Sequence, residues 1–245
     1  MKSTEMIRVI YYIILAYFLL GGIGFYTINR KKEWKDARKS WVKLTTYFVI
    51  INILFFSIVI NPIAFRYLAI LIIVAGVYEL LKLFMNAGYS QKGFLLVSLL
   101  FFGVFALGFY IFSGMERGVI LFSFLILSIF DSFSQITGQL WGQRKIFPKI
   151  SPNKTLGGLI GGTLFAIFSA ILLKGLYTAS SLKALLMAVG IVIFAFTGDI
   201  SASFYKRKYN VKDFSNLIPG HGGFLDRFDS LIAGGAWVAL SEYII

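Results

Sequence analysis

The stretch Phe94–Phe112 reads FLLVSLLFFGVFALGFYIF and contains no charged side chain. An α-helix of about 20 apolar residues is long enough to cross the roughly 30 Å hydrocarbon core of a bilayer. Similar stretches recur along the chain, which is 58% hydrophobic and only 14% charged, whereas a soluble domain is typically about 45–50% apolar and about 25% charged. The sequence therefore predicts an all-α fold, a polytopic integral membrane helical bundle.

We expect about eight transmembrane helices, roughly seven to nine, from the lengths of these apolar stretches. They cover approximately Ile7–Ile28, Leu44–Phe65, Tyr67–Met85, Phe94–Phe112, Val119–Thr137, Leu156–Leu173, Ala184–Tyr205 and Phe224–Ile245. The first has the position of a secretory signal peptide, but no Ala-x-Ala cleavage pattern follows it and it ends in the basic run Arg30-Lys31-Lys32. We therefore expect it to be retained as a span.

The basic residues of the loops fall mostly on one side of the expected bundle. The loops after the first, third, fifth and seventh spans hold most of them, whereas the intervening loops hold only Arg66, Arg117, Lys174 and Lys183. The positive-inside rule places the basic side in the cytoplasm, and eight spans then put both termini outside. Basic loops beside anionic lipid also account for the net charge of +13, and without a soluble basic domain we expect no nucleic-acid partner. For residues 30–43 we favour a solvated loop over an interfacial amphipathic helix.

Several carboxylates lie at membrane depth, where an unpaired charge costs several kcal/mol and usually marks a functional cavity. Within the expected spans these are Glu79, Asp131 and Asp199, and the last span begins with Asp226 and Asp229. All but Glu79 fall near the cytoplasmic ends of their spans and are expected to converge there, beside the basic loops. Acidic and basic groups in one cavity suit a divalent cation together with a polyphosphate. For Glu79, a pair with Lys82 one helical turn away is the alternative.

The segment 203–230 reads SFYKRKYNVKDFSNLIPGHGGFLDRFDS and is the densest polar stretch of the chain. Its Lys and Arg residues supply donors for phosphate oxygens. The glycines of Pro219–Gly223 allow backbone N–H groups to approach an anion closely, just before a helix begins. Asp226 and Asp229 lie three residues apart on one helix face, and hard carboxylate oxygens suit Mg²⁺. Because the chain has no cysteine and one histidine, disulfides, a cysteine nucleophile and a His-rich metal cluster are excluded.

This segment resembles the signature of the CDP-diacylglycerol synthase (phosphatidate cytidylyltransferase) family. It carries Ser-x-x-Lys-Arg, then Lys-Asp-x-Ser, then Pro-Gly-His-Gly-Gly-x-x-Asp-Arg-x-Asp at the family spacing, with Gly198-Asp199 upstream. A second stretch, from Asp131 through Gly138 and Gly142 to Ser151-Pro152-Asn153-Lys154-Thr155, also resembles the family, in which such an Asp opens a loop. The chain departs from the family pattern at Ser132–Gln135, Gln139 and Gly157.

The resemblance covers roughly residues 131–230 and implies a division of the chain. Residues 119–245 are expected to form the catalytic membrane region, with cytoplasmic loops at 138–155 and 205–225, whereas residues 1–118 match only in being hydrophobic spans. The implied activity is a nucleotidyltransferase of phospholipid synthesis in the cell (inner) membrane. It transfers CMP from CTP to phosphatidic acid, giving CDP-diacylglycerol and pyrophosphate, with its active site facing the cytoplasm.

The resemblance also implies roles for individual residues. The expected catalytic residues are Asp199, Lys206, Arg207, Lys212, Asp213, His221, Asp226, Arg227 and Asp229. Those expected to bind substrate are Asp131, Ser151, Lys154, Thr155, Ser203, Gly222 and Gly223. Mg²⁺ is expected on Asp199 and Asp226, with Asp229 as a third or outer partner. His221 is expected to donate a hydrogen bond or to protonate the leaving pyrophosphate, and Asp213 to orient Lys212.

Two other functions remain as alternatives. A CTP-dependent lipid kinase of the dolichol or phytol type would release CDP instead of pyrophosphate, and a transporter would place ionisable groups near the midplane within an internal repeat. The sequence leaves open the lipid phosphate used, the choice of CTP or dCTP, and whether a monovalent cation such as K⁺ assists. It also leaves open a homodimer, because the run Gly157-x-x-x-Gly161 permits close helix packing within or between protomers.

Overall fold

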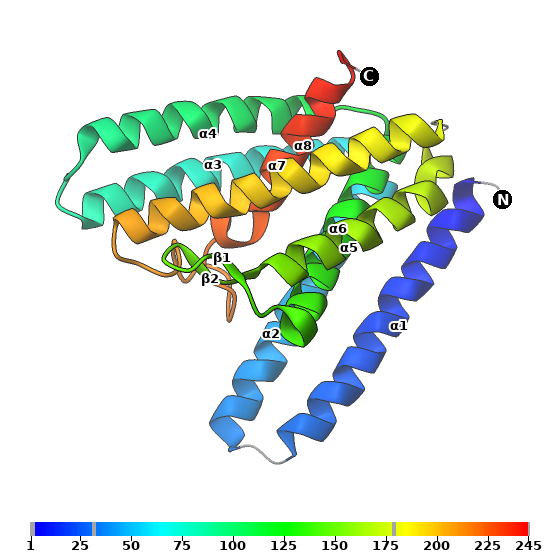
Figure 1. The fold of residues 1–245 in the computed structure, drawn as a ribbon, viewed down its shortest axis with the longest axis horizontal. Helices are drawn as coiled ribbons and strands as arrows, with labels where there is room; N and C mark the ends of the chain where they lie inside the picture. Colours follow the sequence, from blue (N-terminus) through cyan, green and yellow to red (C-terminus); the bar gives the residue numbers. More distant parts are fainter. Residues whose placement is uncertain (1–2, 31–32, 178–179, 245) are drawn as a thin grey trace.

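The computed structural model describes residues 3–30, 33–177 and 180–244, and helices dominate all three ranges (Figure 1). The described helices are α1 Ser3–Asn29, α2 Trp34–Val59, α3 Pro62–Asn86, α4 Lys92–Phe112, α5 Arg117–Trp141, α6 Leu156–Leu173, α7 Ser181–Lys208 and α8 Leu225–Ser241. A short antiparallel hairpin of β1 (Lys145–Phe147) and β2 (Ser151–Thr155) joins α5 to α6, and a single 3₁₀ turn, η1 (Lys174–Leu176), follows α6. The predicted all-α class is confirmed.

Seven of the described helices, α1 to α7, are long and apolar enough to cross a membrane. The eighth expected span corresponds to α8, which has 17 residues and at about 1.5 Å per residue falls short of a 30 Å hydrocarbon core. Instead of facing lipid, α8 is largely buried by its neighbours, with Leu231, Ile232 and Val238 all in the core. The described part of the chain is thus a polytopic membrane bundle of seven long helices, in which the shorter α8 packs against α3, α4, α5 and α7.

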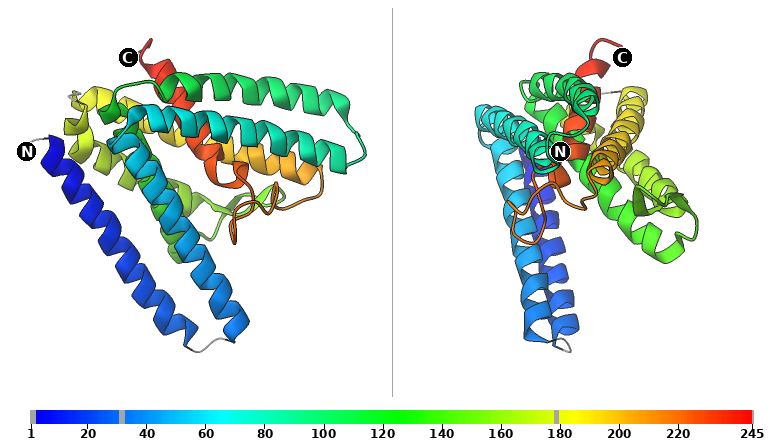
Figure 2. Two further views of the ribbon diagram at one scale, coloured as in Figure 1. Left: turned by 180° about the vertical axis from the view of Figure 1, so that it is seen from behind. Right: turned by 90° about the vertical axis from the view of Figure 1, so that its left-hand side faces the viewer.

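The helices diverge from one end of the bundle toward the other. Figure 1 and both views of Figure 2 show α1 and α2 as an antiparallel pair that leans away from α3, α4 and α7. The start of α1 and the end of α8 lie at the end where the helices come together. The β-hairpin and the segment between α7 and α8 lie where they separate. The polar segment of the sequence therefore lies at the end of the bundle where the helices diverge (Figures 1 and 2).

Two expected helix boundaries in the N-terminal half are wrong. Trp34–Lys43, expected in a solvated loop, forms the first turns of α2, because its Lys, Arg and Ala residues favour a helix and no breaker interrupts it; residues 31–32 lie outside the described part. The break after α2 falls at Asn61, whose side chain accepts a hydrogen bond from the Ile63 amide at 3.0 Å, with Pro62 at the first helical position. Arg66, expected in a loop, therefore lies within α3.

The two loops expected in the catalytic region are shorter than 138–155 and 205–225. Helix α5 continues to Trp141, so Asp131 lies inside a helix and does not open a loop. Helix α7 continues to Lys208 and α8 begins at Leu225. Helix α5 packs closely against α6 through glycines, since a Cβ at Gly158 would lie 2.6 Å from the Ser134 carbonyl oxygen. The small residues of α6 thus serve packing within one chain.

Candidate functional site

Asp226, in the first turn of α8, joins three parts of the polar segment. Its Oδ1 accepts a hydrogen bond from Lys206 Nζ of α7 at 2.6 Å, and its Oδ2 accepts from the backbone amides of Phe214 and Gly223, each at 2.8 Å. The side chain of Lys206 is only 10% exposed and that of Asp226 only 2%. A buried carboxylate with three donors is well stabilised, so Asp226 and Lys206 hold the loop between α7 and α8 against both helices.

Glu79 of α3 anchors the same loop from the N-terminal half of the chain. It is fully buried, and its carboxylate accepts hydrogen bonds from the Ser215 hydroxyl at 2.6 Å and from the amides of Phe224 and Leu225 at 2.9 and 2.8 Å. These amides are the free N–H groups at the start of α8, where a negative charge is favourable. The alternative pair with Lys82 is not formed, because that ammonium lies over the Tyr78 ring, 5.6 Å from its centroid.

The sequence signal for this anchor was present in Glu79 itself, a carboxylate inside an apolar span that must find donors. What the sequence does not reveal is which donors those are. A Cβ at Gly223 would collide with the Glu79 carboxylate. The expected substrate-binding position Gly223 is therefore a place where the backbone must approach another element closely, which only glycine permits.

The Pro-Gly-His-Gly-Gly turn takes its shape from two glycines in left-handed conformations. Gly220 and Gly222 have φ values of +74° and +86°, a region that other residues rarely adopt. The Ile218 amide donates to the Gly222 carbonyl at 2.8 Å and closes the turn. The closed turn presents His221 on its surface.

His221 packs against the N-terminal half of the molecule. Its ring stacks on that of Tyr47 in α2, with centroids 6.2 Å apart and planes inclined by 17°. Burial lowers the pKa of His221 below its usual value of 6.5, and the nearby charges of Arg227 and Lys43 act in the same direction, against the opposing effect of the Pro219 carbonyl. The imidazole is therefore neutral near pH 7, with one nitrogen able to donate. The contact with Tyr47 has no counterpart in the sequence pattern.

A second group of charges surrounds Lys154 at the end of β2. Its ammonium forms an ion pair with Asp199 of α7 and interacts electrostatically with Asp131 of α5 and Asp229 of α8. Burial acts to lower the pKa of Lys154, but these carboxylates outweigh it and the net pKa is raised, so the side chain stays protonated. The hydroxyl of Ser203 lies 3.4 Å from Asp199 Oδ1, a long hydrogen bond. The convergence of Asp131, Asp199 and Asp229 agrees with the expected placement.

The three expected metal ligands do not share one cluster. In the described part of the chain, no three Asp, Glu or His side chains are arranged to hold a metal ion. Both oxygens of Asp226 are engaged by Lys206 and backbone amides, as given above. Asp199 and Asp229 are neighbours, because Gly198 packs so closely on α8 that its Cβ would lie 2.8 Å from the Asp229 carbonyl oxygen. Mg²⁺ commonly uses one or two protein carboxylates and completes its shell with phosphate and water oxygens. This pair fits such a site by its chemistry.

Two of the expected cationic residues donate hydrogen bonds to backbone carbonyls. Arg207 donates to the carbonyls of Ile150 and Val211 at 3.2 and 2.8 Å, which ties the β-hairpin to the loop after α7. Arg227 donates to the His221 carbonyl at 2.9 Å and remains exposed. The first therefore organises the site, whereas the second has donors left for a ligand.

Lys212 and Asp213 are exposed, and neither side chain forms a hydrogen bond or ion pair with another described residue. The expected orientation of Lys212 by Asp213 is thus not formed here. Thr155 caps α6 by accepting from the Gly158 amide at 3.1 Å, and Ser151 begins β2, half-buried. The ammonium of Lys212 is therefore available to bind an anion, whereas the hydroxyl of Thr155 is used to cap α6.

The departures from the family pattern have a structural explanation at one position. A Cβ at Gly157 would lie 3.0 Å from the Trp141 carbonyl oxygen and 3.3 Å from the Gly142 Cα. A glutamate at this position would have to displace the backbone after α5. Ser132–Gln139 lies on α5, where Phe133 stacks on Phe165 of α6 at 3.8 Å between centroids. This stretch is used for helix packing.

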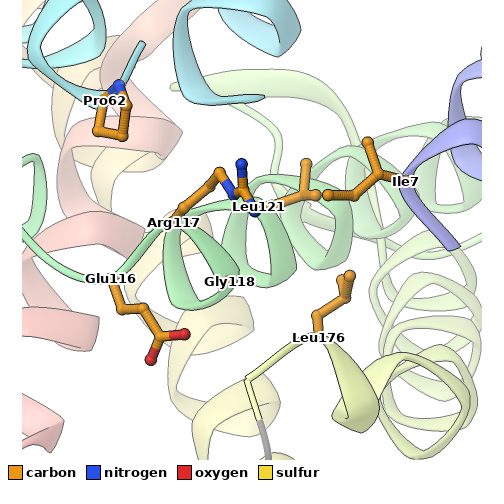
Figure 3. A pocket seen from close by; sticks show the side chains of 7 residues that line it. All are labelled: Ile7, Pro62, Glu116, Arg117, Gly118, Leu121 and Leu176. Atoms are coloured by element: carbon orange, nitrogen blue, oxygen red, sulfur yellow. The ribbon is translucent and has the colours of Figure 1, made fainter. Parts of the chain in front are cut away.

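Two of the cavities among the described residues lie at different distances from these charges. One, of about 330 Å³, is formed by residues such as Pro62, Glu116 and Leu176 at the start of α5 (Figure 3), away from the polar segment. The other, of about 400 Å³, lies between α4, α7 and α8 and is lined by Phe214 and Asp229 among others. The second cavity adjoins the candidate site. The site as a whole combines converging carboxylates, exposed cations and a glycine turn, an arrangement that can hold phosphate groups.

Comparisons with known proteins agree with this chemistry. Residues 98–244 match the model of the Cytidylyltransferase family. A phosphatidate cytidylyltransferase of Rickettsia felis is 31% identical over 210 residues, which cover 81% of this chain and 90% of the relative. The one from Rickettsia conorii is 33% identical over 212 residues with the same coverage. One from Staphylococcus epidermidis is 38% identical over 146 residues, or 59% of this chain and 56% of the relative.

Proposed function

The chain belongs to the cytidylyltransferase family, and from this membership we propose that it is a phosphatidate cytidylyltransferase of phospholipid synthesis. It transfers CMP from CTP to phosphatidic acid and gives CDP-diacylglycerol and pyrophosphate. The observation that carries this is the similarity to the two rickettsial enzymes, which covers 81% of the chain, together with the family match over residues 98–244, which includes the whole polar segment. The lipid-kinase and transporter alternatives are not favoured.

The reaction joins two anions. A phosphate oxygen of phosphatidic acid attacks the α-phosphorus of CTP, a new P–O bond forms, and the bond to the β-phosphate breaks as pyrophosphate leaves. A phosphate anion is already a nucleophile near pH 7, so no strong general base is required. The protein must chiefly neutralise charge and hold the two reactants in line.

The cationic side chains of the site have two different roles, binding phosphate and positioning the loop. Lys212 and Arg227 are exposed and have donors available for the triphosphate. Lys206 and Arg207 are engaged by Asp226 and by backbone carbonyls, and they position the loop that carries the free cations. Lys154 lies among three carboxylates. If another cation binds these carboxylates, the ammonium of Lys154 can donate a hydrogen bond to a phosphate oxygen.

His221 supports departure of pyrophosphate. As a neutral imidazole it donates a hydrogen bond to the leaving oxygen, and it can transfer a proton there only from its protonated form. Gly220 and Gly222 hold it at the surface of the turn, and Tyr47 fixes its ring plane. This role places the pyrophosphate near Arg227, which binds the backbone of the same turn.

Mg²⁺ is the cofactor that we propose, with Asp199 and Asp229 as its protein ligands. When bound, it neutralises phosphate oxygens and stabilises the charge that develops in the transition state. The role of Asp226 as a ligand stays a prediction, because its oxygens hold Lys206 and the loop amides.

The proposed location is the bacterial cell membrane, with the site facing the cytoplasm. The basic loops and the polar segment lie toward the same, divergent end of the bundle (Figure 2), and the positive-inside rule favours the cytoplasm for that end. CTP reaches the site from the cytoplasm and phosphatidic acid reaches it from the bilayer.

The test uses the purified full chain with labelled CTP, phosphatidic acid and Mg²⁺. We expect label in a CDP-lipid and release of pyrophosphate in equal amount. Release of CDP with a newly phosphorylated lipid identifies a kinase and overturns the proposal. Omission of Mg²⁺, and addition of K⁺ to the complete reaction, measure the two cation requirements separately.

A further inference from the structure

Helix α2 contacts the glycine turn before α8 with two side chains. One is Tyr47, whose ring stacks on that of His221. The other is Lys43, four residues earlier, because a Cβ at Gly220 would lie 3.0 Å from Lys43 Cγ and 3.6 Å from its backbone nitrogen. Residues four apart lie on the same face of a helix. One face of α2 therefore covers the turn.

The ammonium of Lys43 is available next to this turn. The residue is exposed, and its side chain forms no hydrogen bond or ion pair with another described residue. Because Cγ is the side-chain atom that approaches Gly220, the atoms Cδ, Cε and Nζ remain to reach an anion at the turn. The ammonium is also close enough to His221 for its charge to lower the pKa of that imidazole.

A second cation, Arg227 of α8, lies next to the same imidazole. Its Nε donates to the His221 carbonyl at 2.9 Å, and its charge also lowers the pKa of His221. Its Nη atoms have no hydrogen-bond partner in the described part of the chain, and the neighbouring carboxylate of Asp226 is paired with Lys206. Two cations from different helices thus lie beside one imidazole with donors unused.

The carboxylate that acts on this group through space is Asp131 of α5. It interacts electrostatically with Arg227 and with the phenol of Tyr47, but among the described residues it forms no ion pair. One carboxylate leaves part of the charge of Lys43 and Arg227 uncompensated. Unpaired cations beside an imidazole that can donate a hydrogen bond favour an anion with more than one negative charge.

The β- and γ-phosphates of CTP have the properties that these donors require. They carry several negative charges and are linked, so that cations from two helices can bind them at the same time. The proposed role of His221 also places the leaving oxygen at the turn. The two phosphates would then lie beside Lys43 and Arg227.

We propose that Lys43 is a further substrate-binding residue, which together with Arg227 binds the β- and γ-phosphates of CTP and the pyrophosphate that leaves. The identity of the nucleotide rests on the proposed function. Lys43 lies outside the residues 98–244 that match the family model, so the N-terminal half of the chain adds a cation to the site. Tyr47, one turn further along α2, keeps this helix in contact with the turn.

The first test measures binding without turnover. The probe is inorganic pyrophosphate with Mg²⁺, titrated into the purified full chain and followed by calorimetry. Loss of one charge-assisted donor in Lys43→Met should raise the Kd about tenfold, whereas Lys43→Arg keeps the charge and should stay near wild type. Lys35→Met removes an exposed lysine about 12 Å away along α2 and is the control. The same Kd in Lys43→Met and Lys35→Met, or no binding to the wild type, overturns the proposal.

The second test identifies which phosphate the ammonium binds. In Lys43→Met, KM for CTP should rise about tenfold, and inhibition by pyrophosphate should weaken by the same factor. KM for phosphatidic acid and inhibition by CMP, which lacks the β- and γ-phosphates, should stay near wild type. A raised KM for phosphatidic acid with an unchanged KM for CTP would assign Lys43 to the lipid headgroup and overturns the proposal.

The two tests also separate this proposal from the proposed function. Because the ammonium of Lys43 is exposed and forms no ion pair with a described residue, Lys43→Met should melt at the same temperature as the wild type. Absence of CDP-lipid formation by the wild type rejects the proposed function. The pyrophosphate titration needs no turnover, so its result supports or overturns the role of Lys43 independently.

Discussion

The backbone amide of Leu225 donates a hydrogen bond to Glu79 Oε2 at 2.8 Å, across 146 residues of sequence. The same carboxylate accepts from the Phe224 amide and the Ser215 hydroxyl. One buried side chain from the N-terminal half thus fixes both the start of α8 and the loop before it. The position of the polar segment 203–230 therefore depends on α3, a helix that contains none of the signature residues.

Glu79→Gln is expected to loosen this anchor while keeping the size of the side chain. The amide nitrogen cannot accept, so it faces backbone donors that then lack a partner, at a cost of about 1–3 kcal/mol. We expect a lower melting temperature in detergent and a lower rate of CTP incorporation into lipid. Glu116→Gln changes an exposed glutamate and is the matched control, which should leave both values unchanged. A Glu79→Gln protein as stable and active as the control would contradict the anchoring role.

Asp226→Asn tests the buried pair with Lys206. The substitution leaves the ammonium without its carboxylate, and breaking one partner of a buried pair costs about 3–5 kcal/mol. We expect marked destabilisation and at least about a 100-fold loss of rate, equivalent to about 2.7 kcal/mol. Thermal unfolding and CTP incorporation measure the two effects.

A second substitution separates charge pairing from a direct part in the chemistry. Asp226→Asn combined with Lys206→Met removes both charges, while the asparagine oxygen can still accept from the amides of Phe214 and Gly223, so we expect stability to recover. If stability returns and activity does not, the carboxylate acts on the reaction as well as on the fold. Full activity in Asp226→Asn would exclude both roles.

The sequence predicted the helical class and the convergence of Asp131, Asp199 and Asp229, because apolar length and charged loops are local properties that the bilayer constrains strongly. It could not predict how each charge is satisfied. The partners of Asp226 lie in α7 and in the loop before α8, and those of Glu79 lie more than a hundred residues away, in the same loop and at the start of α8. Such pairings leave no periodic pattern in the chain.

The boundaries failed for a related reason. Arg66 and the basic residues after Trp34 were assigned to loops because they are charged, yet long basic side chains extend from helix ends toward water or polar partners. Arg66 does so by donating to the Tyr110 hydroxyl at 2.8 Å. The Asn61-Pro62 step was the better boundary signal, since it combines a capping side chain with a residue that begins helices.

The lowered pKa of His221 predicts a pH dependence of stability. The unfolded histidine titrates near 6.5, and the folded one titrates lower because of burial and nearby cations. Below about pH 6.5 the unfolded state takes up the proton first, so stability is complete above this value and is lost as the pH falls through the folded pKa. Comparing melting temperatures at about pH 5 and about pH 8, we expect a smaller acid-induced drop in His221→Asn than in the wild type. Equal drops would show that His221 does not titrate differently on folding.

Lys154→Met is expected to make the protein more dependent on Mg²⁺. Without the ammonium, Asp131, Asp199 and Asp229 repel one another, and a divalent cation becomes their available partner. Adding Mg²⁺ should raise the melting temperature of this variant more than that of the wild type, while its rate falls at least about tenfold, or about 1.4 kcal/mol. Lys145→Met, at an exposed position of β1, is the control. The same response to Mg²⁺ in both variants would remove these carboxylates from consideration as a metal site.

Gly158→Ala tests whether the small residues of α6 serve packing within the chain. The added methyl group would lie 2.6 Å from the Ser134 carbonyl oxygen and 3.2 Å from the Gly138 Cα, so α5 and α6 must separate, at a cost of about 1–3 kcal/mol. Gly103→Ala on α4 adds the same group where nothing lies within 4 Å, and there alanine should be neutral or stabilise by up to about 1 kcal/mol because of its helix propensity. Thermal unfolding of the two variants at several protein concentrations distinguishes the packing modes. A loss in Gly158→Ala that disappears at high concentration would place the contact between protomers, and a concentration-independent loss confirms that α5 and α6 of one chain need the glycine.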